Sequence, residues 1–390
     1  MRRLAALLPV LLLSGCGNDP AGVLSPTPSG LSATVLESGA VHLSWNQCPD
    51  PDFESYTLWR SGTPGIADNP SLATAVFSGM DVLSMVFTDS TASPGQYSYY
   101  VLETRNTSGL KAWSNEVTVF VPDPDPVLTV FFIDPTWGSL SGDAILVRTP
   151  GGGNYLIDGG SSVPQWSCGT DVIIPLLDSL GVSHLDGIVA THPHSDHIGG
   201  LVDVLGTVTV DTVWDCGWPG EASDLYEQFL DEVDACGARY VVARRGMTLD
   251  WGQDLTVRVL HPASNLGSGS MNNASIVLMV SFGDVNVLLA GDLETAGGEE
   301  SVMSAFSPFE LRASVLKVGH HGSSDATGYP WLEAVQPQIG VIEVGAGNPY
   351  GHPHPELLNR LSTSGTAVYR TDLNGTVRIE TDGQTVNVFP

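Results

Sequence analysis

Short runs of apolar and polar residues, separated by turn-forming residues, fill the first part of the chain. Valine, threonine and aromatic residues are common in these runs, and glycine, proline, asparagine, aspartate or serine lies between them. Such spacing is typical of an antiparallel β-sandwich. The pattern therefore predicts an all-β fold with strands at 39–45, 55–60, 85–89, 97–104 and 115–121.

From residue 127 onward the pattern changes, because apolar strand-like runs alternate with longer helical stretches. Alternation on this scale predicts layered α/β packing, with sheets inside and helices outside. The expected strands are 128–133, 144–149, 155–157, 187–190, 256–260, 276–282, 285–290, 315–318 and 339–344. The expected helices are 172–180, 223–236, 296–304 and 355–361.

The charge balance restricts the partners of the chain. Its 390 residues include 43 acidic and 15 basic ones, which gives a formal charge of −28. A field of this sign repels the phosphates of nucleic acids. We therefore expect no broad basic surface for nucleic acid, and the only lysines are Lys111 and Lys317.

The first sixteen residues have the features of an export signal. Two arginines precede an apolar run at 4–13, which is too short to cross a bilayer, and L-S-G-C follows. This ending resembles the lipobox of bacterial lipoproteins, which implies a signal peptide at 1–15, acylation of Cys16, and an extracytoplasmic chain anchored to a bacterial membrane. A secretory signal with an incidental cysteine is the alternative. Residues 16–29 then form a flexible tether.

Four further cysteines remain, namely Cys48, Cys168, Cys216 and Cys236. An oxidising compartment would permit disulfides, and Cys216 with Cys168 or Cys236 is a reasonable pair because all three belong to one domain. None of the spacings gives the close cysteine pairs that a four-cysteine zinc site favours.

Residues 30–121 resemble a fibronectin type III domain. The likeness rests on V-H-L-S-W at 41–45, the tyrosine-rich run at 97–109 and S-N-E-V-T-V at 114–119, in this order. We expect core packing, rather than carbohydrate binding, for Trp45, Tyr56, Tyr97 and Tyr99. Prolines at 122–126 indicate a stiff linker over 122–127.

Thr191-His192-Pro193-His194-Ser195-Asp196-His197 follows one of the predicted strands. Three imidazoles and a carboxylate within six residues of a loop can converge on a metal ion, and crowding them without one has little structural benefit. A solvent-exposed coincidence is the alternative.

The H-x-H-x-D-H motif resembles the signature of the metallo-β-lactamase superfamily. The resemblance implies an αββα sandwich over residues 128–390 and a centre of one or two divalent ions. It assigns His192 and His194 to site one, Asp196 and His197 to site two, and Asp292 to a bridging position. A simple turn is the alternative for Asp292, which follows a predicted strand.

Two further segments extend this resemblance. In V-L-K-V-G-H-H-G-S at 315–323, it implies that one of His320 and His321 binds site two while the other orients the substrate or leaving group. In L-I-D-G-G at 156–160, it implies that Asp158 supports the metal-binding loop through hydrogen bonds. Paired surface histidines and a plain β-turn are the respective alternatives.

One departure concerns site one. Many members of the superfamily carry another histidine where this chain has Met271-Asn272-Asn273-Ala274-Ser275. His261 is a candidate substitute, although a lone histidine at a strand end is more often structural. We therefore expect site one to be weak or filled by a harder ion such as Mn²⁺, with Zn²⁺ as the principal metal.

The asparagines at 272–273, the H-H-G-S run and G-N-P-Y-G-H-P-H-P at 347–355 resemble the narrower ComEC-type group, which includes secreted phosphodiesterases. The resemblance implies hydrolysis of a phosphodiester, either nucleic acid or a head-group or polymer diester, by a metal-bound hydroxide. The residues expected to contact substrate or reacting groups are Asn272, Asn273, Ser323, Ser324, the spare histidine of 320–321 and His352. His352 and His354 have an equally simple explanation as loop residues. The competing functions are hydrolysis of an ester, thioester or lactam, and a non-enzymatic role as a surface lipoprotein. The oligomeric state is left open.

Overall fold

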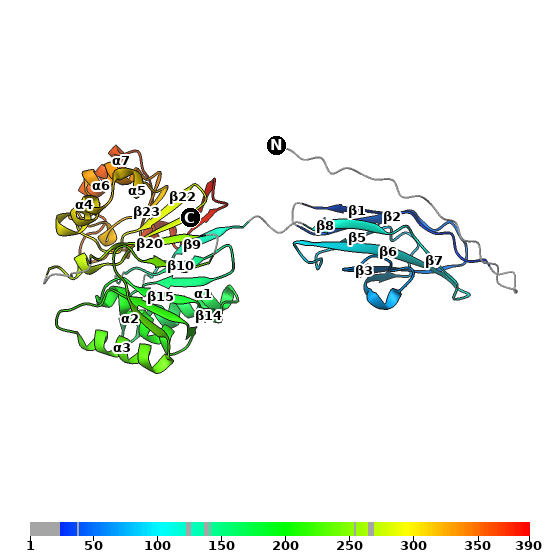
Figure 1. The fold of residues 1–390 in the computed structure, drawn as a ribbon, viewed down its shortest axis with the longest axis horizontal. Helices are drawn as coiled ribbons and strands as arrows, with labels where there is room; N and C mark the ends of the chain where they lie inside the picture. Colours follow the sequence, from blue (N-terminus) through cyan, green and yellow to red (C-terminus); the bar gives the residue numbers. More distant parts are fainter. Residues whose placement is uncertain are drawn as a thin grey trace. The chain divides into compact units, whose positions relative to one another are not determined.

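The computed structural model describes residues 24–36, 39–121, 126–135, 140, 142–252, 255–263 and 269–390. The chain forms two compact units that divide between residues 125 and 126 (Figure 1). Cys16, the expected signal peptide, residues 16–23 of the expected tether and most of the expected linker lie outside the described residues. Within the described ranges, no helix combines the length and the apolar character that crossing a membrane requires.

The N-terminal unit consists of two antiparallel sheets, as the alternating pattern predicted. One sheet has the order β1-β2-β5, with β1 at Leu31–Val35, β2 at Val41–Trp45 and β5 at Val86–Asp89. The other has the order β4-β3-β6-β7, with β8 also paired to β6. Its strands are β3 (Phe53–Ser61), β4 (Thr74–Gly79), β6 (Gln96–Asn106), β7 (Lys111–Trp113) and β8 (Val117–Val121). A short turn of helix covers Pro70–Leu72.

The aromatic residues of this unit follow the two-residue period of the strands. Trp45 and Tyr56 are buried in its core, as expected. The expectation was wrong for Tyr97, which is 57% exposed and packs against Phe120 on the outer surface. Tyr100 occupies the core instead, because it lies at the opposite parity of strand β6.

The C-terminal unit contains two large sheets. The eight-stranded sheet has the order β18-β17-β15-β11-β10-β9-β26-β27, and the seven-stranded sheet has the order β19 to β25. The first consists of β9 (Leu128–Phe132), β10 (Ile145–Arg148), β11 (Asn154–Ile157), β15 (Gly187–Ala190), β17 (Thr212–Asp215), β18 (Arg239–Val242), β26 (Val377–Thr381) and β27 (Val386–Phe389). The second consists of β19 (Thr248–Leu249), β20 (Thr256–His261), β21 (Val277–Phe282), β22 (Val285–Leu289), β23 (Val315–Lys317), β24 (Ile339–Ile342) and β25 (Ala367–Arg370).

Eight α-helices accompany these sheets in the described part of the unit. They are α1 (Ile174–Ser179), α2 (Ser195–Leu205), α3 (Asp224–Cys236), α4 (Glu300–Ala305), α5 (Pro308–Leu311), α6 (Tyr329–Val335), α7 (Pro355–Thr363) and α8 (Thr371–Asn374). Two small ribbons pair β12 (Ser162–Val163) with β13 (Trp166–Ser167), and β14 (His184–Leu185) with β16 (Thr209–Val210). Single helical turns cover Gly169–Ile173, Asn272–Ala274, Thr295–Glu299 and His320–Gly322.

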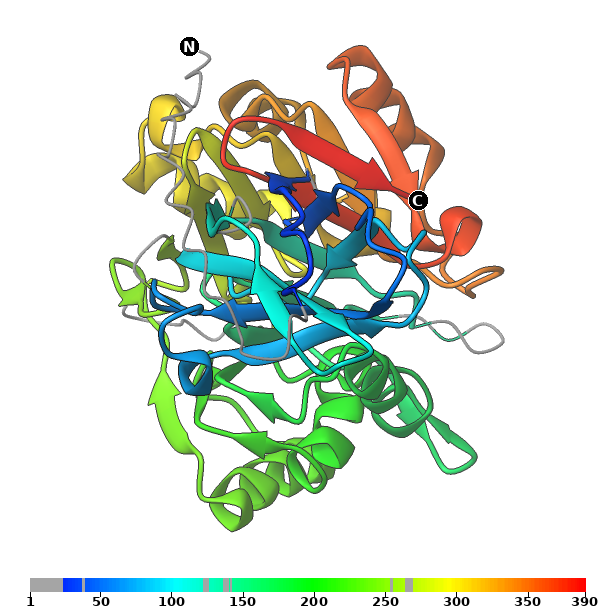
Figure 2. The same ribbon diagram turned by 90° about the vertical axis from the view of Figure 1, so that its right-hand side faces the viewer.

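The apolar residues of this unit form three layers. The central layer lies between the two sheets and contains side chains from both, such as Val147 and Val287. A second layer joins the eight-stranded sheet to α1, α2 and α3, and a third joins the seven-stranded sheet to α4, α6 and α7. In both views α2 and α3, drawn in green, lie opposite the gold and orange helices (Figures 1 and 2). The unit is an αββα sandwich, as the family resemblance implied.

The direction of the strands places the segments that carry the histidines and aspartates at one edge of each sheet. In the eight-stranded sheet, β11 runs parallel to β15, and in the other sheet β22, β23 and β24 run parallel to one another. The carboxyl ends of parallel strands meet at the same edge of a sheet. The segments that follow these strands, at 158–160 and 191–194 in one sheet and at 290–292, 318–322 and 343–345 in the other, are therefore neighbours within each sheet, and contacts such as that of His321 with Asp196 join the two sets.

The four described cysteines are free thiols. The pairing of Cys216 with Cys168 or Cys236 that the sequence allowed is therefore absent. Cys168 belongs to the layer between the eight-stranded sheet and its helices, whereas Cys216 belongs to the layer between the sheets. Cys236 ends helix α3 and is exposed.

Candidate metal centre

Asp158 holds the start of the segment 191–194, which carries His192 and His194, through hydrogen bonds. This buried carboxylate follows β11, has a left-handed backbone with φ of 58°, and accepts two hydrogen bonds from Thr191. They come from the Thr191 backbone amide at 2.7 Å and from its hydroxyl at 2.6 Å. The next residue, His192, thus leaves strand β15 in a fixed direction.

Asp158 also orients His197 within helix α2. The Nδ1 atom of His197 lies 2.7 Å from Asp158 Oδ2, and its Nε2 atom lies 3.2 Å from Asp292 Oδ2. Burial opposes a charge on His197, but Asp292 and Asp158 raise the pKa of this imidazole well above its ordinary value. A metal ion that binds Nε2 must therefore displace a proton.

Four imidazoles surround one oxygen of Asp292, which lies just beyond the end of strand β22. Its backbone amide donates a hydrogen bond of 3.1 Å to the Ser275 hydroxyl. Burial disfavours its charge, yet His321 and His197 hold the pKa of Asp292 well below its usual range. Asp292 Oδ2 lies 3.2 Å from an Nε2 nitrogen of His197, 3.3 Å from that of His321, and 4.0 Å from those of His192 and His320.

The structure separates His320 from His321. His321 is buried, its Nδ1 atom donates to the Glu343 carbonyl at 3.0 Å, and its Nε2 atom lies 3.3 Å from both Asp196 Oδ2 and Asp292 Oδ2. The side chain of His320 is 22% exposed, and its Nδ1 atom lies 3.2 Å from Asp325 Oδ1. Both histidines have positive φ angles, 48° and 50°, which non-glycine residues adopt mainly where the surroundings impose them.

His192 and His194 present two nitrogens to each other. The Nε2 atom of His192 lies 2.9 Å from the Nδ1 atom of His194. Burial lowers the pKa of both imidazoles, and the shift is largest for His192, which is completely buried. Neutral imidazoles are the form that binds metal ions.

The donor cluster, comprising His192, His194, Asp196, His197, Asp292 and His321, fits a divalent metal. Triads such as His192, His197 and Asp292, or Asp196, His197 and His321, bring one atom from each residue within 4.8 Å of one another. The buried Nε2 atoms of His197 and His321 lie 3.2 and 3.3 Å from Asp292 Oδ2 but form no hydrogen bond of regular geometry. Nitrogen with carboxylate oxygen is a ligand set that suits Zn²⁺, and buried nitrogens without a regular hydrogen bond are costly unless a ligand uses them.

Asn272 and Asn273 lie beside this cluster on a helical turn. The amide of Asn272 donates to Glu294 at 2.8 Å and lies 3.4 Å from His320 Nε2, which places it at the cluster. The amide nitrogen of Asn273 donates to Glu294 at 3.1 Å and to Ala296 O at 3.0 Å. The two asparagines therefore differ, because only Asn272 approaches a histidine of the site.

His261 has a backbone partner in this structure. Its Nδ1 atom lies 3.0 Å from the Ser275 carbonyl oxygen, and burial lowers the pKa of the ring to about 4. This contact joins strand β20 to the segment before β21, which is a structural role. It gives no support to His261 as a substitute ligand.

The segment 347–354 carries two further imidazoles, those of His352 and His354, and the first of them lies near His320. The His352 ring lies 5.7 Å from that of His320, and burial lowers the pKa of His352 to about 4. The Nδ1 atom of His354 accepts a hydrogen bond of 2.9 Å from the Ser324 backbone amide. This bond joins the segment 347–354 to the segment after the histidine pair. Ser323 is buried, and its amide donates to the His320 carbonyl.

Sequence reasoning missed Asp143, Lys317 and Glu343, which lie directly behind the donor cluster. All three side chains are buried. Lys317 forms an ion pair with Asp143, donates to the Gly291 carbonyl at 3.0 Å and lies 3.6 Å from Asp292 Oδ1. The available signal was a lysine, one of only two in the chain, at the end of an apolar strand three residues before a histidine pair.

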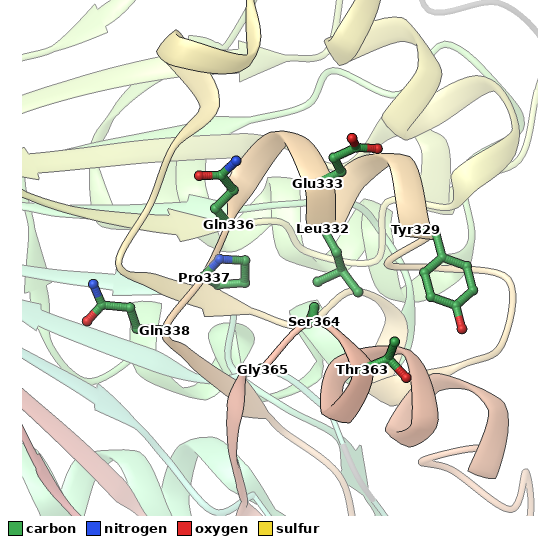
Figure 3. A pocket seen from close by; sticks show the side chains of 9 residues that line it. All are labelled: Tyr329, Leu332, Glu333, Gln336, Pro337, Gln338, Thr363, Ser364 and Gly365. Atoms are coloured by element: carbon green, nitrogen blue, oxygen red, sulfur yellow. The ribbon is translucent and has the colours of Figure 1, made fainter.

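One hollow, lined by none of these residues, lies at the end of helix α6 (Figure 3). It has a cavity volume of about 620 Å³ and is lined by the side chains of α6, the segment 336–338 and residues 363–365. Glu333 is the one acidic residue in its lining, which includes no histidine. The hollow has none of the donors described above and is not the candidate centre.

Comparison with known proteins places this geometry in a family. The model of the metallo-beta-lactamase superfamily matches residues 137–345. ComE operon protein 3 of Bacillus subtilis is 36% identical over 264 residues, which cover 64% of this chain and 33% of that protein. Competence protein ComA of Neisseria gonorrhoeae is 31% identical over 259 residues, covering 66% and 33% respectively.

The family model covers more than half of the chain, and the chain belongs to the metallo-beta-lactamase superfamily. Its sequence relatives belong to the ComEC-type group that the motifs resembled, which confirms that expectation. The chain spans about a third of the length of these curated relatives. Among solved structures, a diphosphatase from the PhnP family aligns with 65% of this chain and 98% of its own, at 15% identity and a TM-score of 0.38.

Proposed function

We propose that this chain is a metal-dependent hydrolase that cleaves phosphodiesters. The observation that carries the proposal is the convergence of four imidazoles on a single buried oxygen of Asp292, with two of the facing nitrogens forming no hydrogen bond of regular geometry. The superfamily assignment supports metal-dependent hydrolysis, and the choice of a phosphodiester rests on the ComEC-type likeness of the sequence motifs.

The donors divide into two groups around Asp292. Following the family resemblance, we group Asp196 with His197 and His321, of which Asp196 and His321 are in contact at 3.3 Å. His192 and His194 form the second group with two nitrogens, and no third imidazole has been identified for it among the described residues. We assign the first group to the tighter site for Zn²⁺ and the second to a weaker site for Zn²⁺ or Mn²⁺. A divalent ion held there supplies hydroxide near neutral pH and polarises the scissile centre.

His320 is the candidate proton donor of this reaction. Asp325 lies at its Nδ1 atom, so that Nε2 faces Asp292 and the amide of Asn272. A carboxylate at Nδ1 orients the ring, and in the imidazolium form of His320 the Nε2 atom also carries a proton that points toward the substrate. We assign to His320 Nε2 the proton that reaches the leaving oxygen, and to Asn272 a hydrogen bond to a phosphate oxygen.

The charge of the whole chain favours small or locally presented diesters. A net charge of −28 repels long polyanions, and the chain contains only 15 lysines and arginines. Head-group diesters, polymer diesters and short single strands reach the centre at a smaller electrostatic cost than duplex DNA does. We therefore place nuclease action on duplex DNA below the other phosphodiesterase activities.

A substrate panel tests the proposal. Metal-free protein is reloaded with Zn²⁺ or Mn²⁺ and assayed on bis-p-nitrophenyl phosphate, single- and double-stranded DNA, a phosphocholine ester and a β-lactam. We expect turnover of the model diester that a chelator abolishes. Turnover of the β-lactam alone would transfer the chain to the lactam hydrolases, and no turnover in any reloaded sample would contradict the enzymatic function.

We also propose that the chain is exported and anchored to a bacterial membrane through a lipid on Cys16. The support is the basic start, the apolar run and the L-S-G-C sequence at 13–16. On this proposal the fibronectin-like unit at 30–121 spaces the catalytic unit from the membrane. Any phosphodiester substrate then lies outside the cytoplasm.

A further inference from the structure

Lys317 is a buried cation directly behind the candidate metal centre. Its side chain is completely buried at the end of strand β23, three residues before His320. Placing an isolated ammonium group in a protein interior is costly unless nearby groups compensate its charge. The surroundings of Lys317 supply that compensation and at the same time connect it to the donor cluster.

The ammonium group of Lys317 has three oxygen neighbours. It is ion-paired with Asp143 Oδ2, donates a hydrogen bond of 3.0 Å to the Gly291 carbonyl, and lies 3.6 Å from Asp292 Oδ1. Gly291 directly precedes Asp292, so Lys317 contacts both the backbone and the side chain at the end of β22. Because Lys317 attracts Oδ1, the other carboxylate oxygen of Asp292 is left facing the imidazoles.

Asp143 extends this arrangement to the other half of the unit. It precedes strand β10 of the eight-stranded sheet, whereas Lys317 ends β23 and Asp292 follows β22 in the seven-stranded sheet. Asp143 Oδ1 lies 3.3 Å from His321 Nδ1, and its backbone amide donates to the Asp196 carbonyl at 3.2 Å. The ion pair therefore joins the two sheets at the level of the donor cluster.

The residue before Asp143 must be small for this contact to form. Gly142 has a φ of 155°, and a Cβ atom built there would lie 2.0 Å from the Asp196 backbone oxygen. Only a glycine lets the Asp143 segment approach the start of helix α2 so closely. The Gly-Asp pair thus brings Asp143 between Asp196, His321 and Lys317.

We infer that Lys317 and Asp143 form a positioning pair for the metal centre. Lys317 fixes the Asp292 carboxylate so that Oδ2 faces the metal site, and Asp143 contacts His321 at Nδ1, the ring nitrogen away from the metal-facing Nε2 atom. Both residues act through Asp292 and His321 and do not touch the substrate. This inference rests on the proposed metal-dependent function.

The full chain offers a direct test, because Lys111 and Lys317 are its only lysines. Metal-free protein carrying ¹⁵N-labelled lysine gives two side-chain ammonium signals, and the Lys111→Arg variant assigns them. Zn²⁺ is titrated while calorimetry records binding on the same sample. We expect the Lys317 signal to move in step with the bound metal and the Lys111 signal to stay in place. Bound zinc with an unchanged Lys317 signal overturns the inference alone, whereas no bound zinc overturns the proposed function as well.

A double variant separates positioning from simple stabilisation. Lys317→Met with Asp143→Asn removes one charge of each sign, so the net charge of the centre stays the same. We expect this variant to retain its melting temperature within a few degrees in the metal-free state and to bind Zn²⁺ at least 10-fold more weakly, the lower range for residues that support metal ligands. Parental zinc affinity in the folded double variant overturns the inference, and the lysine signal decides the matter if the variant does not fold.

The matched control neutralises another ion pair of the same unit. Arg370 and Asp372 are paired through two contacts of 2.9 and 2.6 Å on β25 and α8. Arg370→Met with Asp372→Asn should leave zinc affinity within 2-fold of the parent. A loss as large as that of the Lys317 and Asp143 double variant would show that neutralising any ion pair weakens the centre, and would also overturn the inference.

Discussion

Asp292 is the residue on which the two halves of the donor cluster depend. Its Oδ2 atom is the common neighbour of His192, His197, His320 and His321. Asp158, in contrast, reaches the centre only through Thr191 and His197. The two carboxylates therefore make different contributions to metal binding.

Replacing each of these carboxylates tests that difference. Asp292→Ala should lower metal affinity and kcat by more than about 100-fold, because both groups of ligands lose their shared oxygen. Asp158→Asn should cost only about 10- to 100-fold, the range typical of residues that support metal ligands. Calorimetric metal titration and turnover of a diester measure both effects. Unchanged activity in Asp292→Ala would remove Asp292 from the centre.

The histidine pair provides a second comparison at this scale. His321→Ala should lose at least 10-fold in zinc affinity, because His321 Nε2 faces both Asp196 and Asp292. His320→Ala should keep zinc affinity within a few-fold and lose kcat by about 100-fold, as expected for a general acid. Metal content after dialysis, read beside kcat, separates the two. An equal loss of zinc in both variants contradicts the separate roles.

The histidines could be predicted from the sequence, whereas the ion pair behind them could not. His192, His194, Asp196 and His197 lie within six residues, so their convergence is a local property. Asp143 and Lys317 are separated by 174 positions and meet only because two sheets pack face to face. The choice of His321 over His320 likewise depends on backbone angles that no local pattern specifies.

At the scale of elements, the segment after the histidine pair is held by a buried acid. Glu299 is the last residue of the kinked helical turn before α4 and accepts hydrogen bonds from the amides of Thr327 and Gly328, the latter at 3.1 Å. Burial raises the pKa of Glu299 to about 7. Among the described residues, the Glu299 carboxyl group forms no hydrogen bond to a metal ligand. Its ionisation makes the stability of the segment at 327–328 dependent on pH.

The sign of this dependence follows from proton linkage. Between the unfolded pKa near 4.5 and the folded pKa of about 7, the folded state holds the proton of Glu299 more tightly than the unfolded state does. Its contribution to stability is therefore complete below pH 4.5 and is lost as the pH rises to 7, by about 3 kcal/mol at most. Glu299→Gln should reduce the fall in stability between pH 5 and 7 relative to the parent, as measured by urea unfolding. Parallel pH profiles for parent and variant would contradict the buried-acid assignment.

Strands and helices were predictable to different degrees. The expected strands at 187–190 and 276–282 coincide closely with β15 and β21, because both are continuous apolar runs. The predicted helix at 223–236 contains the whole of α3 and its N-cap, since Ser223 caps its start and Gly237 ends it in a left-handed conformation. Helix α6 was not predicted, because its seven residues include a proline and follow a glycine, and its identity comes from packing of Trp331 in the core.

At the scale of the whole molecule, the proposed lipid anchor determines where the enzyme works. Cys16→Ser should convert a membrane-bound chain into a released or unprocessed one, because each buried methylene of a lipid contributes about 0.8 kcal/mol to membrane binding. Fractionation of cells that express parent and variant measures the change. A variant as firmly membrane-bound as the parent would contradict the lipobox interpretation.

The central claim is that the donor cluster is a metal centre with two unequal sites. Titration of the metal-free full chain with Zn²⁺, by calorimetry and with diester turnover followed in the same samples, tests it most directly. The account predicts one tight ion, held by Asp196, His197, Asp292 and His321, a second ion bound at least 10-fold more weakly, and turnover that depends on bound metal. Two equally tight sites would show that the His192 and His194 side has a ligand not assigned here, and full turnover in chelator-treated protein would contradict the account.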